Sequence, residues 1–354
     1  MTKSIIFIII LLAMAGGMLW YRNTGQFPLP QGEPMPLNEQ AESGKFPEES
    51  VAEAPQKNEG APAANRPIFV TNDTKHSIPL NEILSGGPGK DGIPSIDNPK
   101  FVSTAEADGF LKNDDVGLSI AYNGETKFYP YQILVWHEIV NDSFNGKPAL
   151  VTYCPLCATG IAFDPVVNSA RYEFGVSGKL WQSNLLMYNR TSNPDTESLW
   201  SQVLGEAVLG PLTGTKLHII PSDTVQYGEW KRQHPQTSVL SRDTGAARSY
   251  GADPYGDYYT SESVSFGASF NDTRLHPKAF VLGIEVNGQY KAYHKDVLPT
   301  GVTADAFAGR QITIVKGEIG EVRMFISPAK EPLPYIGGFW FSWLAVHPTT
   351  ELFK

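Results

Sequence analysis

The chain has 354 residues, of which 41% are apolar and 18% charged, and its formal net charge is -9. This length suffices for about two domains. The content of 33 Gly and 27 Pro favours turns and short strands. The acidic balance, with no basic run beyond the pair Lys231 and Arg232, argues against a nucleic-acid partner.

An apolar segment without charge runs from Ile5 to Trp20, after Lys3 and before Arg22. Its length is at the lower end of the about 17 to 25 residues that span a bilayer. Residues 1–23 are therefore predicted to be a membrane anchor or a cleaved signal peptide. Either interpretation places the remainder outside the cytoplasm, anchored in the cell envelope or secreted. The membrane is then one expected partner, and another protein of the envelope is a second.

Residues 24–66 are rich in Pro, Glu, Gln, Ala and Gly and carry few large apolar side chains. Such a composition buries too little surface to offset the entropy lost on folding. This segment is predicted to be a disordered linker between the membrane and a folded part that begins at about residue 67.

A hairpin is predicted at residues 116–129, where two apolar strands flank the turn residues Asn123 and Gly124. Pro130 follows, and the apolar positions from Ile133 to Val140 recur at helical spacing. They predict a short helix that ends near Asn141.

The same pattern occurs a second time. Residues 281–293 repeat the hairpin around Asn287 and Gly288, and residues 305–309 resemble 142–146. Both copies close with Trp followed four positions later by His-Pro. We therefore predict two related modules, residues 67–245 and 246–354, in an α+β, β-rich fold of mainly antiparallel strands with short helices.

The two cysteines of the chain, Cys154 and Cys157, form a Cys-x-x-Cys loop between two predicted strands of the first module. Two thiolates at this spacing can bind one soft ion at about 2.3 Å. His137 is the predicted third ligand and Met187 a weak fourth. With imidazole and thioether the set suits copper, and with imidazole and water it suits zinc. Binding or delivery of such a metal is the leading hypothesis, because the second module lacks these residues.

Two alternatives remain open for the same loop. The cysteines can act as a thiol–disulfide oxidoreductase, in which Cys154 attacks and Cys157 resolves. This hypothesis predicts an accessible Cys154 with a lowered pKa. The other alternative is a structural or protein-binding module with a static disulfide, which would close a loop too small to add much stability.

A polar pocket is also predicted in the first module. Arg190 is able to clamp a carboxylate, with a surface ion pair of little energetic weight as the alternative, and the later polar run contributes Trp200 and Gln202. Glu138, beside His137, completes the predicted pocket.

The residues around the cysteines carry a resemblance to a known family. The matching segments are Trp136 to Asp142, Tyr153-Cys154-Pro155-Leu156-Cys157-Ala158-Thr159-Gly160, Phe174 to Gly178, Leu185 to Arg190, Trp200-Ser201-Gln202, Gly210 to Gly214 and His234 to Leu240. In these segments the chain resembles the bacterial "domain of unknown function 3179" family over most of residues 100–245. Asn189 departs from the acidic residue expected before Arg190. The resemblance implies the domain and an envelope location, but no activity.

Overall fold

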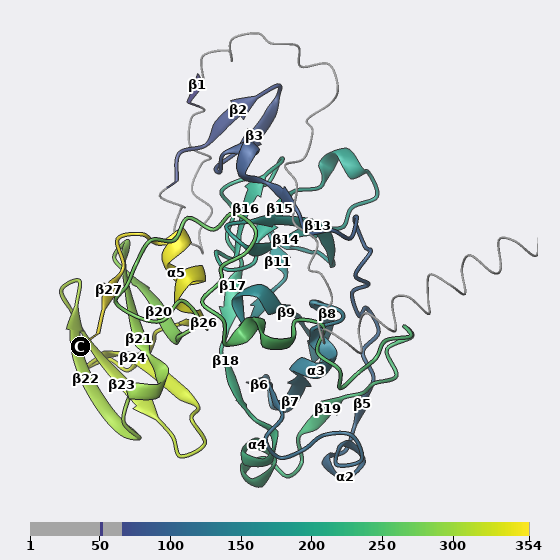
Figure 1. Ribbon diagram of the computed structural model, residues 1–354, viewed down its shortest axis with the longest axis vertical. Helices are drawn as coiled ribbons and strands as arrows, with labels where there is room; N and C mark the ends of the chain where they lie inside the picture. Colours follow the sequence, from purple (N-terminus) through teal and green to yellow (C-terminus); the bar gives the residue numbers. More distant parts are fainter. Residues whose placement is uncertain (1–49, 52–65, 354) are drawn as a thin grey trace, which may run out of the picture.

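The computed structural model describes residues 50–51 and 66–353 (Figure 1). These residues form mainly antiparallel sheets with short helices, so the predicted α+β, β-rich class is confirmed. The predicted membrane segment 1–23 lies outside the described residues, as does the linker 24–66 apart from 50–51 and Arg66. Over the described ranges, no helix has the length and apolar character needed to cross a bilayer.

The first predicted hairpin lies at the centre of a five-stranded sheet. Its turn is formed by Asn123 and Gly124, whose φ angles of 47° and 80° are those of the tight turns that join two strands. The strands, in spatial order, are β18 (Ser222–Gln226), β6 (Val116–Tyr122), β7 (Glu125–Pro130), β19 (Ser238–Leu240) and β5 (Phe101–Val102). β19 runs parallel to β7, and α4 (Tyr227–Gln233) connects β18 to β19.

The second predicted hairpin lies in a four-stranded sheet whose order corresponds to β18, β6, β7 and β19 of the first. Here Asn287 and Gly288 form the turn, with φ angles of 50° and 73°. The strands are β26 (Ile336–Phe339), β20 (Phe280–Val286), β21 (Gln289–His294) and β27 (Glu351–Leu352). β27 runs parallel to β21, and α5 (Trp340–Val346) connects β26 to β27. The repeated sequence thus folds with the same connectivity in both places.

Each hairpin also carries the same buried polar contact. The Asp142 carboxylate accepts a hydrogen bond from the Tyr129 hydroxyl at 2.5 Å and pairs with the Lys127 ammonium at 3.0 Å. The corresponding residues of the second copy are Lys291, Tyr293 and Asp305, with both distances to the carboxylate at 2.7 Å. The equivalence of Asp142 and Asp305 therefore rests on a shared role in stabilising the hairpin.

The remaining strands complete four further sheets. One sheet contains β17 (His218–Ile220), β10 (Thr159–Asp164), β9 (Lys147–Cys154) and β8 (Ile139–Phe144). A second contains β1 (Ser50–Val51), β2 (Phe69–Thr71), β3 (Thr74–His76), β16 (Glu206–Leu209), β15 (Leu199–Ser201), β14 (Asn184–Asn189), β13 (Phe174–Trp181) and β4 (Leu84–Ser85). β11 (Val166–Val167) pairs with β12 (Ala170–Arg171), and the last sheet contains β22 (Gly301–Phe307), β23 (Arg310–Lys316), β24 (Val322–Ser327) and β25 (Glu331–Pro332).

The other helices are each one turn long. They are α2 (Thr104–Ala107), α3 (Tyr131–Leu134) and the 3-10 turns η1 (Leu80–Glu82), η2 (Pro155–Cys157), η3 (Pro194–Thr196), η4 (Gly256–Tyr259) and η5 (Lys295–Val297).

The helix predicted after Pro130 is much shorter than expected. α3 ends at Leu134, and β8 begins at Ile139. Between them Glu138 has a φ angle of +59°, which a right-handed helix cannot contain. The β-branched Ile139 and Val140 instead pair with β9, so tertiary pairing overrides the helical spacing of the apolar positions.

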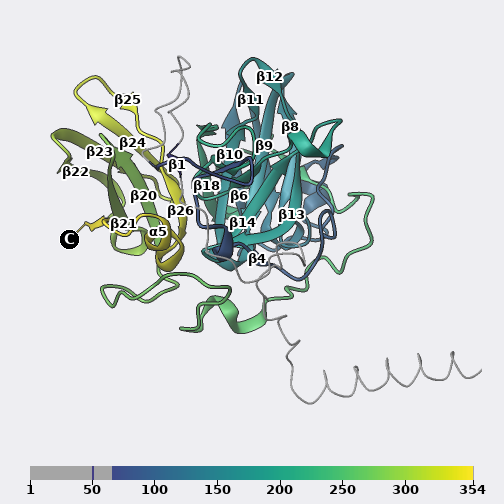
Figure 2. The ribbon, with the colours of Figure 1, turned by 90° about the horizontal axis from the view of Figure 1, so that it is seen from above.

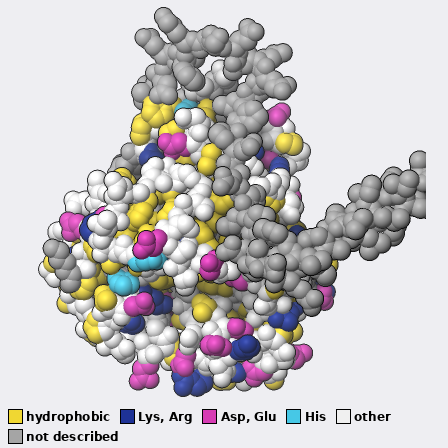
Figure 3. Space-filling view, viewed as in Figure 1, with side chains coloured by type: hydrophobic (Ala, Val, Ile, Leu, Met, Phe, Trp, Pro, Cys, Tyr) yellow, Lys and Arg dark blue, Asp and Glu magenta, His cyan; other side chains and the backbone are white. Residues whose placement is uncertain are grey.

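The C-terminal sheets lie beside the first part of the chain, with β26 and α5 nearest to it (Figure 2). β26 packs against β10, the strand that follows the two cysteines. On the face shown in Figure 3, basic and acidic side chains are interspersed, so this face has no extended region of one sign.

Replacing Asp142 with Ala should lower the free energy of unfolding by about 3 kcal/mol, because it leaves a buried ammonium without its counter-charge. The exposed fraction of the Lys127 side chain is only 9%. Chemical denaturation followed by tryptophan fluorescence measures the change. Asp243→Ala is the control, since its partner Lys100 is 63% exposed and this pair should contribute nothing measurable. Equal stability of both variants would contradict the assignment.

Candidate functional site

The Cys-x-x-Cys loop joins two paired strands. β9 ends at Cys154, residues 155–157 form the 3-10 turn η2, and Ala158 has a φ angle of 47° that reverses the chain into β10. Cys154 and Thr159 are then partners across the β9–β10 ladder. This tight reversal brings the Sγ atoms of Cys154 and Cys157 to 3.2 Å from each other.

Both sulfur atoms are buried, with exposed fractions of 1% for Cys154 and 0% for Cys157. The Cys157 thiol contacts the carbonyl oxygen of Ser183 at 3.2 Å, and the amide nitrogen of Asn184 donates to its sulfur at 3.4 Å. Asn184 also donates to the side-chain oxygen of Gln202 at 2.9 Å. The predicted pocket residue Gln202 therefore acts on the cysteines indirectly, by orienting Asn184.

The C-terminal part of the chain closes the site from the other side. Gly338 of β26 lies so close to the loop that a Cβ atom there would collide with the Thr159 hydroxyl and touch the Cys157 carbonyl oxygen. The Tyr258 hydroxyl donates to the Leu156 carbonyl oxygen at 2.9 Å. The Lys278 ammonium lies 3.4 Å from the centre of the Tyr258 ring. Residues after 245 thus form part of the site, although the second copy has no cysteine of its own.

The two thiols differ in acidity. Burial raises the pKa of Cys154, and its contact with Cys157 adds to this increase. Burial also opposes ionisation of Cys157, but the contacts of its sulfur with the side chains of Cys154 and Asn184 favour the thiolate, and the pKa of Cys157 lies below its usual value. Cys157 is therefore the sulfur that ionises first, while Cys154 remains a thiol.

Glu138 is the third ionisable group of the site. Its side chain is 7% exposed and has no hydrogen-bond partner among the described residues. Its carbonyl oxygen accepts a hydrogen bond from the Tyr153 amide at 2.8 Å, which fixes Glu138 beside Cys154. A positive φ angle at a residue other than glycine is strained, and such strain is often found at functional sites. Burial raises the pKa of Glu138 from 4.5 to about 8.

Glu138 lines a cavity of about 330 Å³ next to the cysteine loop. Leu156, which lies between the two cysteines in the sequence, is part of the same wall. Most of the other lining side chains are apolar, and they include Ile93, Val176, Leu180, Leu185, Tyr255 and Phe266, while Lys179 and Arg248 are the basic residues of the lining. A carboxyl group without a partner in such surroundings can bind a proton at neutral pH and pass it to a bound molecule.

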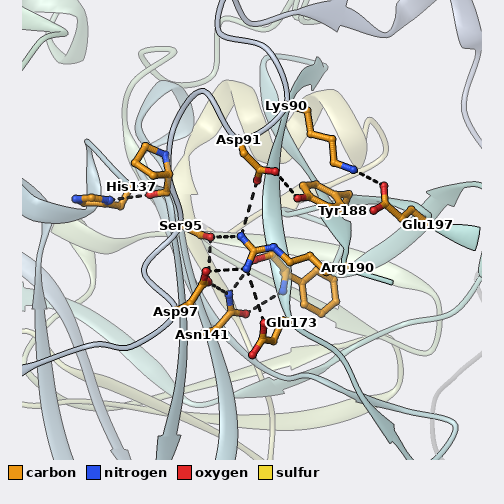
Figure 4. A network of polar contacts seen from close by, with 12 residues as sticks. Lys90, Asp91, Ser95, Asp97, His137, Asn141, Glu173, Tyr188, Arg190 and Glu197 are labelled. Atoms are coloured by element: carbon orange, nitrogen blue, oxygen red, sulfur yellow. Dashed lines mark hydrogen bonds and ion pairs between the residues drawn. The ribbon is translucent and has the colours of Figure 1, made fainter. Parts of the chain in front are cut away.

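The predicted ligand His137 is held by other contacts. Its Nδ1 lies 2.7 Å from the carbonyl oxygen of Pro94 and its Nε2 lies 2.6 Å from the Tyr250 hydroxyl. Figure 4 shows the imidazole directed at the chain around Pro94. Across residues 50–51 and 66–353, no three His, Cys, Asp or Glu side chains form a group that could hold a metal ion. His137 therefore does not complete a three-ligand set with the cysteines.

Met187 is fully buried in β14, between its strand partners Val176 and Trp200. It belongs to the same apolar core as the two cysteines. Met187 therefore packs as a core side chain, as a thioether does well among apolar neighbours.

Arg190 and Trp200 do not line the cavity. Arg190 pairs with Asp97 at 2.8 Å and donates to the Ser95 hydroxyl at 2.6 Å (Figure 4). The carboxylates of Asp91 and Glu173 each lie 3.8 Å away, so its charge is already balanced. The indole nitrogen of the fully buried Trp200 donates to the Asn189 side chain at 2.9 Å. The acceptor is an amide oxygen, so this contact does not need the acidic residue expected at position 189. Of the four predicted pocket residues, the structure places only Glu138 at the cavity.

Several residues of the site have no signal in the sequence. Asn184, Tyr258, Lys278 and Ser342 come from separate segments and belong to no recognisable motif. Asn184 of β14, Tyr258 of η4 and Ser342 of α5 come to the cysteine loop through packing, and Lys278 lies against Tyr258.

Comparison with known families identifies the family of the chain. A family model described as "Protein of unknown function (DUF3179)" matches residues 90–329. The chain therefore belongs to the DUF3179 family, as the sequence segments around the cysteines indicate. The match extends beyond the expected residues 100–245 into the second copy, which agrees with the part that residues after 245 play in the site. No curated protein matches the chain, and no solved structure matches it.

The raised pKa of Glu138 predicts a pH dependence of stability. Between pH 4.5 and about 8 the folded chain keeps a proton that the unfolded chain has lost. The free energy of unfolding should therefore decrease as the pH rises through this range, by about 1.4 kcal/mol per pH unit from this group.

Denaturation curves at several pH values, compared with those of Glu138→Gln, measure this contribution. The difference between the two proteins should grow with pH in favour of the variant. Glu262→Gln is the control, because Glu262 is exposed and away from the cavity. Parallel pH profiles for Glu138→Gln and the parent chain would contradict the assignment.

Proposed function

We propose that Cys154 and Cys157 form a redox site that cycles between a dithiol and a disulfide. The observation that carries the proposal is the pair of sulfur atoms at 3.2 Å, with pKa values shifted in opposite directions. A redox-active pair needs one sulfur that ionises readily and a second that closes the bond. The buried carboxyl of Glu138 beside them supplies a site for the proton that is released.

The roles of the two cysteines are the reverse of those expected from the sequence. Cys154 is buried and its pKa is raised, whereas the oxidoreductase hypothesis expects an accessible Cys154 with a lowered pKa. In the proposed site Cys157 is the attacking thiolate and Cys154 is the resolving thiol. Oxidation forms the Cys154–Cys157 bond and gives two electrons to an acceptor and two protons to Glu138 and the product.

The location of the protein is part of the proposal. The apolar segment from Ile5 to Trp20 supports an anchored position in the cell envelope, with the globular part on the extracytoplasmic side. Thiols in such a compartment are usually paired or ligated, and a reversible disulfide is one way to meet that condition.

The test of the redox site is a reduction potential. The purified chain is equilibrated with dithiol–disulfide buffers, quenched in acid and alkylated, and its free thiols are counted. We expect one two-electron transition with a potential between about -270 and -120 mV, the range of redox-active Cys-x-x-Cys pairs. Cys154→Ser and Cys157→Ser should each abolish the transition.

Two other results would contradict the proposal. A potential below about -300 mV would indicate a static structural disulfide. Stoichiometric copper or zinc that is lost in Cys154→Ser, together with thiols that never oxidise, would support soft-metal binding by the two thiolates instead. The metal content of the same preparation is measured alongside.

A further inference from the structure

A second cavity, of about 470 Å³, lies between the two copies of the scaffold. One side of its wall comes from the segments 203–206 and 216–219, and the other side comes from the second hairpin and α5. The exposed residues His218 and Asn287 belong to the wall, so the cavity opens to solvent. Its volume lies within the about 300 to 1,000 Å³ of sites that bind small molecules.

Three residues of this wall carry buried polar atoms that lack partners. The atoms are Oε1 of Glu206, Nε1 of Trp343 and Nδ1 of His347, and none of them has a hydrogen bond to any residue within 50–51 and 66–353. The three residues are 1%, 4% and 6% exposed. A buried polar atom without a partner is costly, and native proteins usually satisfy it. Three such atoms around one cavity match the needs of a polar ligand.

The first copy shows that the missing partner is not a property of the scaffold. There Trp230 occupies the position of Trp343, and its indole nitrogen donates to the Thr237 hydroxyl at 3.1 Å. The corresponding threonine of the second copy is Thr350, whose hydroxyl instead donates to the His347 carbonyl oxygen at 2.6 Å. The second copy therefore leaves the indole N–H without the acceptor that the first copy provides.

The charges around the cavity are already balanced. The Arg66 guanidinium lies 3.9 Å from the Glu206 carboxyl, and the Lys216 ammonium lies 3.4 Å from the Glu285 carboxyl. All four residues line the cavity. With two basic and two acidic side chains paired in this way, the cavity favours a neutral molecule over an anion or a cation.

Aromatic rings form the part of the wall next to the unpartnered atoms. The Tyr290 ring stacks on the His347 imidazole with centroids 3.9 Å apart, and the Trp343 ring lies 4.3 Å from the same imidazole. Burial, with the nearby charges of Arg66 and Lys216, holds the pKa of His347 well below its usual range. The neutral imidazole has one N–H donor and one acceptor nitrogen. A matching ligand has apolar faces and an edge of groups that both donate and accept.

We propose that this cavity binds a neutral saccharide, whose hydroxyl groups bond the Glu206 carboxyl, the Trp343 indole N–H and the His347 imidazole. A pyranose ring combines C–H faces with hydroxyl groups on adjacent carbon atoms, and each hydroxyl is donor and acceptor at once. A simple alcohol has only one such group, and an amino acid adds two charges where the wall is already paired. The inference is independent of the proposed redox function, because the cysteine loop contributes no residue to this wall.

Calorimetric titration of the full chain tests the proposal. The probes are glucose, galactose, mannose and N-acetylglucosamine, with cyclohexanol and leucine as comparison ligands. We expect at least one sugar to bind with a dissociation constant of about 1 mM or lower. It should bind at least tenfold more tightly than either comparison ligand. In the ¹⁵N-labelled chain, this sugar should shift the indole N–H resonance of Trp343 downfield as the hydrogen bond forms.

Two variants locate the sugar in the cavity. Trp343→Phe keeps an aromatic ring but removes the N–H donor, and it should weaken binding about tenfold. Trp230→Phe is the matched control, because this tryptophan has the equivalent position, a satisfied N–H and no part in the wall. Leu204→Trp fills the cavity from a half-buried position and should abolish binding. Circular dichroism checks that each variant is folded.

Each contrary outcome overturns the proposal in a different way. If none of the four sugars binds, the cavity has no saccharide function. Tighter binding of leucine would assign a zwitterion to the cavity, and equal binding of cyclohexanol would show that the unpartnered atoms do not select the ligand. If a sugar binds folded Leu204→Trp as tightly as the parent chain, it occupies another site. The redox titration of Cys154 and Cys157 is decided separately from all of these results.

Discussion

The packing of β26 and α5 against the cysteine loop is the contact on which the rest of the site depends. It leaves no room for a side chain at Gly338, whose Cβ would meet the Thr159 hydroxyl and the Cys157 carbonyl oxygen. Because this packing excludes water, the ionisation of each thiol is decided by a few fixed neighbours and not by solvent. Burial among the apolar residues of the cavity, on another side of the loop, raises the pKa of Glu138. The cover over the cysteine loop and the cavity beside Glu138 are thus formed by different segments of the chain.

The duplicated scaffold explains how one chain supplies both the reactive loop and its cover. The two hairpin sheets have four strands in corresponding order, and both depend on a Lys–Tyr–Asp contact. In the first copy the strand after the hairpin region leads into Cys154, whereas in the second copy Val315 is followed by Lys316 and Gly317. The second copy keeps the fold and lacks the thiols, and its β26 and α5 serve to enclose the first.

The sequence was informative where the signal is local. The Asn-Gly turns, the strands on both sides of the cysteines and the short repeats all depend on neighbouring residues, and the structure has them. Polar residues inside the family segments were less informative, because their residue types do not reveal their partners. His137 bonds a main-chain carbonyl, and Arg190 is surrounded by carboxylates. The strained backbone of Glu138 and the contacts of Tyr258 and Gly338 with the cysteine loop arise between distant segments, which spacing along the chain does not encode.

The most direct measurement is a pH titration of the two cysteine Cβ resonances in the reduced chain, labelled with ¹³C at cysteine and assigned with Cys154→Ser and Cys157→Ser. The proposed roles require that the two thiols differ in acidity. We therefore predict that Cys157 ionises at a lower pH than an ordinary thiol and Cys154 at a higher one. The reverse order, or a common pKa near the ordinary thiol value of about 8.5 for both residues, would contradict it.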